Sequence, residues 1–525
     1  MSEAAGELAL EEFISSVKEY WTTLNLDFIP YAGGKCHLVR GWDDLFAQLD
    51  EHISSLEAMK HSPHYKVFET DTRSWEDRLT KLRLLLDIWV DVQRRYVYLE
   101  GIFCNSEDIR TLLPTESARF GSVDAEFVSI MKKVFDTKVN ILDIMSTDTY
   151  ILKTLERLGR TLSRIQKALG DYLEMQRAQF PRFYFVGDED LLEMIGNSQD
   201  LTVITQHLNK MFAGIAGIET RQDEEDVNTV WITALRSRES EIVQLGDVHR
   251  VPVDVSVDGT AVPGQQQQHR RGIHYILTSI EKAMHARLPE LLNMAMDPSL
   301  SILDLARQFP AQIALLACQA RWYNAQSEAF GIQGGTAALL EDCKAKLEAL
   351  SAAGGAVQGG DDPLLRRKYE QLISEVIHQR EMSRHLDSVK CTSPQHFEWL
   401  RILKHRWYPN DMRLTVEICS AVFEYGFEYL GVCDKLVQTP LTDRCYMALA
   451  QTLDMRLGGN PFGPAGTGKT ETVKSLGAQL GRLVMVFCCD ESFDFAAMGR
   501  IFVGLCQSAN RSSLSSLGYD IRRMK

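Results

Sequence analysis

Apolar residues recur every three or four positions along most of the first 400 residues, a spacing that predicts amphipathic α-helices. The longest regular stripe runs from Ile151 to about Met175. Its apolar positions are Leu155, Leu158, Leu162, Ile165, Leu169 and Tyr172. In places such stripes are wider than a two-stranded coiled coil needs. We therefore favour core faces of stacked antiparallel helices over an extended coiled coil.

The same spacing predicts further helices along the chain. They cover residues 8–24, 42–59, 273–292, 313–330, 337–352, 364–386, 416–429 and 444–457. One more helix carries Trp75, Leu79, Leu82, Leu86 and Trp89 on one face. Because Ser74 and Asp77 resemble a capping box, we predict that this helix begins at Ser74, and that it ends at Gly101.

The pattern changes within residues 180–197, which read FPRFYFVGDEDLLEMIGN. Pro181 ends the preceding helix, and Asp188 can cap the next one. We interpret the aromatic run 182–186 as a packed junction between two helical blocks, with a mechanical joint or a docking surface as the alternative. The acidic residues 188–190 fit charges at a helix N-terminus better than a catalytic cluster.

Helical spacing also weakens between Gly217 and Arg271. Residues 228–235 and 241–255 predict a small β-element, in which Val251 to Val255 alternate in the manner of an edge strand. Segments rich in Gly, Pro, Gln or Ala around 256–271 and 353–363 predict flexible loops.

Composition limits the class of protein. A chain of 525 residues with 45% hydrophobic residues has enough apolar material for several cores. The net charge of −14 argues against generic nucleic-acid binding. The eleven cysteines show no zinc-ligand spacing, which favours reduced thiols in a cytosolic setting. The chain shows no signal peptide and no run of about 18 apolar residues, so we expect no membrane span.

The strongest chemical motif is the octapeptide GPAGTGKT, formed by Gly463, Pro464, Ala465, Gly466, Thr467, Gly468, Lys469 and Thr470. Its glycines allow backbone N–H groups to point at phosphate oxygens. Lys469 supplies a positive charge for the β- and γ-phosphates, and the Thr470 hydroxyl is placed to bind Mg²⁺. The motif predicts ATP with Mg²⁺ as ligands, and the alternative is a glycine-rich turn before a helix.

The flanks of this loop predict part of an α/β layer. Residues 470–480 form a predicted helix with Val473, Leu476 and Leu480 on one face. Residues 482–488 are almost wholly apolar, which predicts a strand buried on both faces, as in a parallel sheet. A strand should also precede the loop, but we can only infer it because 444–457 has helical spacing.

Seven long segments follow one another along nearly the whole chain. The first four are RGWDDLF (40–46), SWEDRL, DVQRRYVYLEGIF and FPRFYFVGDEDLLEMIGNS. The last three are PLTDRCY (440–446), RLGGNPFGPAGTGKTETVKSLGAQLGR and CDESFDFAAMGRIFVGLCQ (489–507). Together they resemble dynein heavy chains, more closely the cytoplasmic than the axonemal branch. The first four resemble the linker of that family, and the last three resemble its first AAA+ module.

The resemblance implies a mainly α fold with three parts. Residues 1–415 would form an elongated multi-helix linker with a possible joint near 180–197, and residues 416–507 the N-terminal part of an α/β P-loop (AAA+) module. Residues 508–525 form a divergent Ser-rich tail. In this family the first module is the main ATP-hydrolysing site of a six-module ring, and the linker is a lever that pulls toward microtubule minus ends.

The resemblance also implies ligands and partners. It places the adenine pocket on 436–441, with Val437, Pro440 and Leu441 as its apolar candidates. Partners would be the remaining AAA+ ring, dynein intermediate and light intermediate chains bound through a tail, and microtubules bound through a stalk. Tail and stalk fall outside this sequence, and the expected location is cytoplasmic, on the microtubule cytoskeleton.

One family feature is absent after Gln507, where a Walker-B Phe-Asp-Glu is expected. Asp520 has no adjacent Glu, and the pair Asp490-Glu491 matches an earlier strand of the family, so we assign no catalytic residue. We expect a motor fragment that binds nucleotide weakly without turnover, with an open apolar sheet edge prone to aggregation. A non-catalytic helical interaction protein with a vestigial P-loop is the alternative, and a free-standing P-loop kinase is least favoured.

Overall fold

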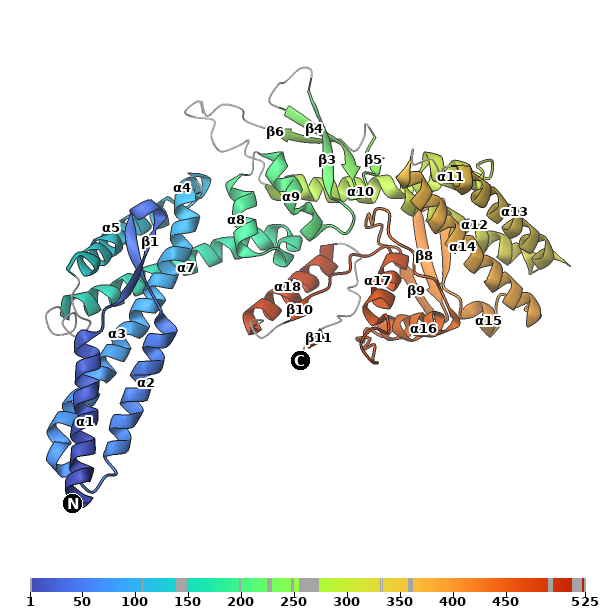
Figure 1. Cartoon of the computed structure of the whole chain (residues 1–525). Coiled ribbons are helices and arrows are strands. Elements are labelled where there is room, and N and C mark those ends of the chain that lie inside the picture. Colours follow the sequence, from blue (N-terminus) through green and yellow to red (C-terminus); the bar gives the residue numbers. More distant parts are fainter. Residues whose placement is uncertain are drawn as a thin grey trace. The chain divides into compact units, whose positions relative to one another are not determined.

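The computed structural model describes residues 2–105, 107–137, 149–197, 200–223, 229–246, 250–254, 273–330, 332, 334–356, 362–489, 494–511 and 522–523 (Figure 1). The chain divides into two compact units, Met1–Glu174 and Met175–Lys525. The fold is mainly α, as the hydrophobic spacing predicts, with a few small sheets.

The first unit consists of helices and one hairpin. Its elements are α1 (Ser2–Thr23), β1 (Asp27–Tyr31), η1 (Ala32–Gly34), β2 (Cys36–Arg40), α2 (Trp42–Met59), α3 (Tyr65–Asn105), α4 (Glu107–Leu112), α5 (Pro114–Thr137) and most of α7 (Thr149–Gln179). The strands β1 and β2 are antiparallel. Trp21, Leu49 and Leu79 come from three different helices and are fully buried in one shared core.

The second unit adds two small antiparallel sheets and a short parallel pair. It begins with η2 (Pro181–Phe185), α8 (Asp188–Gly196), α9 (Leu201–Met211), β3 (Gly217–Gln222), β4 (Thr229–Arg236), β5 (Ile242–Gln244), β6 (Val251–Asp254), α10 (Ile273–Ala295), α11 (Ile302–Gln308), α12 (Ala311–Ala329), α13 (Gly335–Ala356) and α14 (Pro363–Ser388). It continues with α15 (Phe397–Leu400), β7 (Lys404–Tyr408), β8 (Arg413–Ile418), β9 (Ala421–Glu424), α16 (Pro440–Asp454), α17 (Lys469–Gln479), β10 (Cys488–Cys489), α18 (Phe495–Arg511) and β11 (Arg522–Arg523). In the sheets β4 pairs with β3, β5 and β6, and β8 lies between β7 and β9.

Most of the predicted elements are confirmed. The stripe of α7 faces inward, and Leu155, Leu158, Leu162, Ile165 and Leu169 are at most 2% exposed. The predicted β-element is present as β4, β5 and β6, with β6 paired antiparallel to β4. Among the helices that the structure describes, none combines the length and the hydropathy that crossing a membrane requires.

The predicted boundaries of the helix around Trp75 are wrong. Helix α3 begins at Tyr65 and continues past Gly101 to Asn105, so Ser74 lies in its interior. The reason is that the apolar face begins earlier, because Phe68 already packs against the same core as Trp75. A capping-box pattern has no effect where the preceding turn is already helical.

The predicted helix over 416–429 is also wrong. Residues 413–418 and 421–424 form the antiparallel strands β8 and β9. Leu414, Val416 and Ile418 are buried at every second position, which is the period of a strand with one face on the core. Over so few residues, a period of two resembles part of a helical stripe.

The junction at 180–197 is packed, as predicted. Helix α7 ends before Pro181, and Phe180, Phe183 and Tyr184 are buried. The predicted cap is wrong, because Gly187 is the N-cap of α8 and Asp188 pairs with Arg177 and Arg500 instead. Of the predicted loops, 256–271 and 357–361 lie outside the described residues, and 353–356 belong to α13.

Candidate functional site

The GPAGTGKT motif forms one exposed loop that ends at the start of α17. Gly466 and Gly468 have φ values of 78° and 77°, a left-handed backbone that favours glycine. Gly468 is the N-cap of α17, so the helix begins directly at Lys469. The unpaired N–H groups of a helix N-terminus attract anions. The structure thus brings Gly463 to Thr470 together in one exposed loop at a helix N-terminus.

Lys469 lies folded back within this loop. Its Nζ donates to the carbonyl oxygen of Gly463 at 2.9 Å and also to that of Pro464. The Thr467 hydroxyl donates to the same Pro464 oxygen at 2.9 Å. Because a phosphate oxygen is a stronger acceptor than a neutral carbonyl, this ammonium group can exchange its partners for a nucleotide.

Helix α17 is anchored along its length. Val473, Leu476 and Leu480 are buried on one face, which confirms the predicted helix. The Tyr446 hydroxyl on α16 donates to the Ser475 hydroxyl on α17 at 2.8 Å. This bond and the apolar face hold α17 in place beside α16, and α17 in turn fixes the end of the loop.

The end of α17 is fixed by backbone bonds to the segment that follows β9. The N–H groups of Gly426 and Glu428 donate to the carbonyl oxygens of Leu480 and Gly481, each at 2.9 Å. Gly481 has φ 62°, and a Cβ atom there would lie 2.3 Å from the ring of Tyr425. The chain can turn so close to Tyr425 only because residue 481 is glycine.

The predicted adenine-pocket residues lie around the start of α16. The Thr439 hydroxyl caps this helix by accepting from the N–H of Thr442 at 3.3 Å, and Pro440 occupies its first position. Val437 and Leu441 are 73% and 71% exposed. These apolar side chains are available to a flat ring, and their role in adenine binding stays a prediction.

The predicted buried strand over 482–488 is wrong. Only Cys488–Cys489 are in a strand, β10, which pairs parallel with β11. The preceding apolar residues are only partly buried, and Val486 is 43% exposed. An apolar run becomes a central strand only when strands on both sides pair with it, and the described residues supply none next to 482–487.

The strand inferred directly before the loop is absent, because all of residues 455–468 are described and none of them is in a strand. Helix α16 is the element that precedes the loop. Asp490, Glu491 and Asp520 lie outside the described residues.

A buried charge cluster, which no local sequence pattern predicts, joins the aromatic junction to the segment that directly follows β9. Arg182 of η2 donates to both carboxylate oxygens of Glu428, at 2.9 and 2.8 Å, and to Glu281 at 2.9 Å. The Glu428 carboxylate also accepts from the N–H of Ala213. Burial opposes the ionisation of Glu428, but the attraction of Arg182 outweighs it, so the pKa of Glu428 lies below its usual value.

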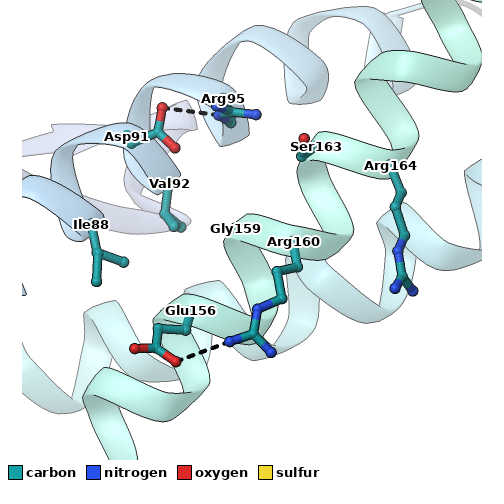
Figure 2. A pocket seen from close by; sticks show the side chains of 9 residues that line it. All are labelled: Ile88, Asp91, Val92, Arg95, Glu156, Gly159, Arg160, Ser163 and Arg164. Atoms are coloured by element: carbon teal, nitrogen blue, oxygen red, sulfur yellow. Dashed lines mark hydrogen bonds and ion pairs between the residues drawn. The ribbon is translucent and has the colours of Figure 1, made fainter.

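A hollow lies in the first unit, between α3 and α7. It measures about 500 Å³, and its lining residues are Ile88, Asp91, Val92, Arg95, Glu156, Gly159, Arg160, Ser163 and Arg164 (Figure 2). Asp91 pairs with Arg95 and Glu156 pairs with Arg160, each within one helix. Because these ion pairs neutralise much of the charge that lines the hollow, we assign the hollow no ligand.

Comparison with known proteins adds the following. Residues 1–295 match the family model described as "Dynein heavy chain, N-terminal region 2", and residues 425–514 match "Hydrolytic ATP binding site of dynein motor region". The chain is 46% identical over 519 residues to the cytoplasmic dynein heavy chain of Neurospora crassa, and 46% over 527 residues to that of Dictyostelium discoideum. It is 45% identical over 522 residues to that of Drosophila melanogaster. These alignments cover 96% of this chain but only 11%, 10% and 11% of the relatives, so the chain spans about a tenth of their length.

Proposed function

The chain belongs to the dynein heavy chain family, and we propose that it binds ATP through the loop 463–470 and carries the lever of a microtubule motor. The observation that supports nucleotide binding is the left-handed Gly468 at the exposed N-terminus of α17, with the Lys469 ammonium held inside the same loop.

Each site residue has a proposed role. Backbone N–H groups of Gly463, Pro464, Ala465, Gly466, Thr467 and Gly468 surround the phosphates, and Lys469 binds the β- and γ-phosphates. Thr470 follows Lys469 in the first turn of α17, where its hydroxyl fits the role of a single protein ligand to Mg²⁺. Val437, Pro440 and Leu441 contact the adenine ring.

We retain the division into a helical linker, the N-terminal part of an AAA+ module and a Ser-rich tail. The proposed boundary at 415/416 falls inside β8, and the matching family model begins at 425, just after β9. We therefore move the proposed start of the module to the end of this sheet. The packed junction 180–197 is the proposed joint of the lever, since two-state mechanical elements need a compact hinge.

The whole-protein properties are proposals that follow from family membership. We propose that the chain works with the remaining AAA+ ring, moves toward microtubule minus ends and acts in the cytoplasm on the microtubule cytoskeleton. Dynein intermediate and light intermediate chains and microtubules would bind through parts of the protein that this sequence does not include.

ATP binding to the purified 525-residue chain tests the proposal. Lys469→Ala should weaken the affinity for ATP with Mg²⁺ by about 10- to 100-fold, because hydrogen bonds to charged groups contribute about 1.5–3 kcal/mol. Lys474→Ala is the matched control, since Lys474 lies on the same helix and pairs only with the exposed Glu471. Equal affinities of both variants would contradict the proposed site.

Turnover is measured with the same proteins. We expect binding without hydrolysis, because we assign no residue to activate water. Steady hydrolysis by the unaltered chain that Lys469→Ala abolishes would show instead that the chain is a complete enzyme.

A further inference from the structure

Three side chains from two helices meet beside the aromatic junction, outside the nucleotide loop. Asp190 and Glu193 lie one turn apart on α8, and His207 lies on α9. Each offers one ligand atom, and these atoms lie within 4.8 Å of one another. We propose that this cluster binds a divalent transition-metal ion, with Zn²⁺ as the expected ion.

The imidazole of His207 supplies the observation that points to a cation. Its side chain is 8% exposed, and its Nε2 lies 3.2 Å from Oε2 of Glu193. Its Nδ1 is buried and has no hydrogen-bond partner. When Nε2–H donates to Glu193, Nδ1 carries a lone pair. A buried lone pair without a partner is costly, so a bound cation would stabilise it.

The atom that faces this lone pair is also an acceptor. Oδ1 of Asp190 lies 3.8 Å from Nδ1 of His207. That separation is too long for a hydrogen bond. It is shorter than the sum of a zinc–nitrogen and a zinc–oxygen bond, about 4.1 Å, so one ion can reach both atoms.

The three residues therefore have different roles. Nδ1 of His207 and Oδ1 of Asp190 bind the ion directly. Glu193 accepts from Nε2–H and fixes the tautomer, as carboxylates commonly do behind a metal-bound histidine. The imidazole nitrogen favours Zn²⁺ over Mg²⁺ and Ca²⁺, which prefer oxygen ligands only.

Lys210 limits the affinity of the site. Its Nζ lies 2.7 Å from Oδ2 of Asp190, the oxygen that does not face His207. Its positive charge opposes a second cation on the same carboxylate. Replacing Lys210 by an uncharged residue should therefore tighten metal binding rather than weaken it.

Metal binding would connect α8 directly to α9. Helix α8 directly follows η2, and α9 packs against it. A bound metal ion would therefore stiffen the junction, and this effect does not depend on nucleotide binding.

Thermal unfolding of the full chain, stripped with EDTA and titrated with ZnCl₂, tests the site. We expect Zn²⁺ to raise the Tm of the unaltered chain, and His207→Gln and Asp190→Asn to lose most of this increase. His61→Gln is the matched control, because His61 is exposed in the turn between α2 and α3. Zinc bound by cysteines contributes equally to every variant, so the difference between His207→Gln and His61→Gln is the readout.

Two further variants sharpen the result. Lys210→Met should lower the Zn²⁺ concentration at half-effect by at least about threefold, because it removes the competing charge. Glu193→Gln should keep part of the effect, since its amide oxygen still accepts from Nε2–H. Should His207→Gln fail to fold, Asp190→Asn at a partly exposed position decides the outcome. No Zn²⁺ effect in the unaltered chain, or an equal effect in Asp190→Asn and His61→Gln, would overturn the site.

Discussion

Arg182 and Glu428 are separated by 246 positions in sequence, yet two parallel hydrogen bonds of 2.9 and 2.8 Å join them in the interior. Their side chains are 4% and 0% exposed. The pair ties the aromatic junction to the segment whose backbone bonds hold the end of α17. The pair is therefore a direct, buried link between these two parts of the chain.

Removing one partner of this pair should strongly destabilise the second unit. Arg182→Met leaves the buried Glu428 carboxylate without its partner, and we expect a loss of about 3–5 kcal/mol. The double variant Arg182→Met with Glu428→Met should recover most of it, because the fully buried Glu428 charge is then removed too, and the other partner of Arg182, Glu281, is 23% exposed. Urea unfolding measures both. Arg366→Met is the control, since its pair with Glu370 is about 60% exposed on both sides and should change stability by less than about 1 kcal/mol.

The same pair predicts acid sensitivity. The pKa of Glu428 lies below its ordinary value of 4.5, so the folded state holds the carboxylate ionised more strongly than the unfolded state does. This contribution is complete above pH 4.5 and is lost as the pH falls through the folded-state pKa. Glu428→Gln should unfold at a lower urea concentration at pH 6 and lose less stability than the unaltered chain on acidification. Equal losses of stability in both proteins on acidification would contradict this role of the Arg182–Glu428 pair.

Hydrophobic spacing predicts most of this fold because local rules decide it. The apolar stripe of α7 needs no knowledge of its partner, only a face that turns away from water. The strand over 413–418 is not predicted because six residues with period two resemble a fragment of a helical stripe. The apolar run 482–488 was misread for a different reason, since a strand depends on neighbours that lie elsewhere in the chain.

For the candidate site too, local spacing predicts some features and not others. The loop 463–470 can be predicted because its spacing alone encodes left-handed glycines and a helix start. No local pattern marks Arg182 as the partner of Glu428, or His207 as the neighbour of Asp190. Both contacts arise when elements that are separate in sequence pack together, so only the folded chain brings these residues together.

Burial of His405 predicts a second pH effect. Burial lowers the pKa of His405 to about 4, partly offset by its bond to the Gln479 carbonyl oxygen. The unfolded chain then binds this proton more readily, so stability falls as the pH drops from about 6.5 toward 4, by up to roughly 3 kcal/mol. His405→Gln should show a shallower dependence of the urea midpoint over this range. An unchanged slope would mean that His405 does not contribute.

The turn after α17 should tolerate no side chain. Gly481→Ala places a Cβ atom against Tyr425 at φ 62°, which combines a clash with backbone strain of about 1–3 kcal/mol. We expect a clearly lowered Tm. Gly101→Ala is the matched control, since Gly101 lies within α3 with no atom near the added Cβ. That change should be neutral or stabilise by up to about 1 kcal/mol, and equal effects of both substitutions would contradict the crowded turn.

Thr470 should link nucleotide affinity to Mg²⁺. In the unaltered chain, Mg²⁺ should tighten ATP binding, and EDTA should reverse the effect. Thr470→Val keeps the size of the side chain but removes the hydroxyl, so the gain from Mg²⁺ should fall by about tenfold, or 1.4 kcal/mol. Affinity measured in EDTA should stay the same, because Lys469 and the loop N–H groups are unchanged. Thr472→Val is the control two residues further along the same helix, where the hydroxyl donates to the Gly468 carbonyl oxygen at 3.0 Å. If both variants respond to Mg²⁺ like the unaltered chain, Thr470 is not the metal ligand.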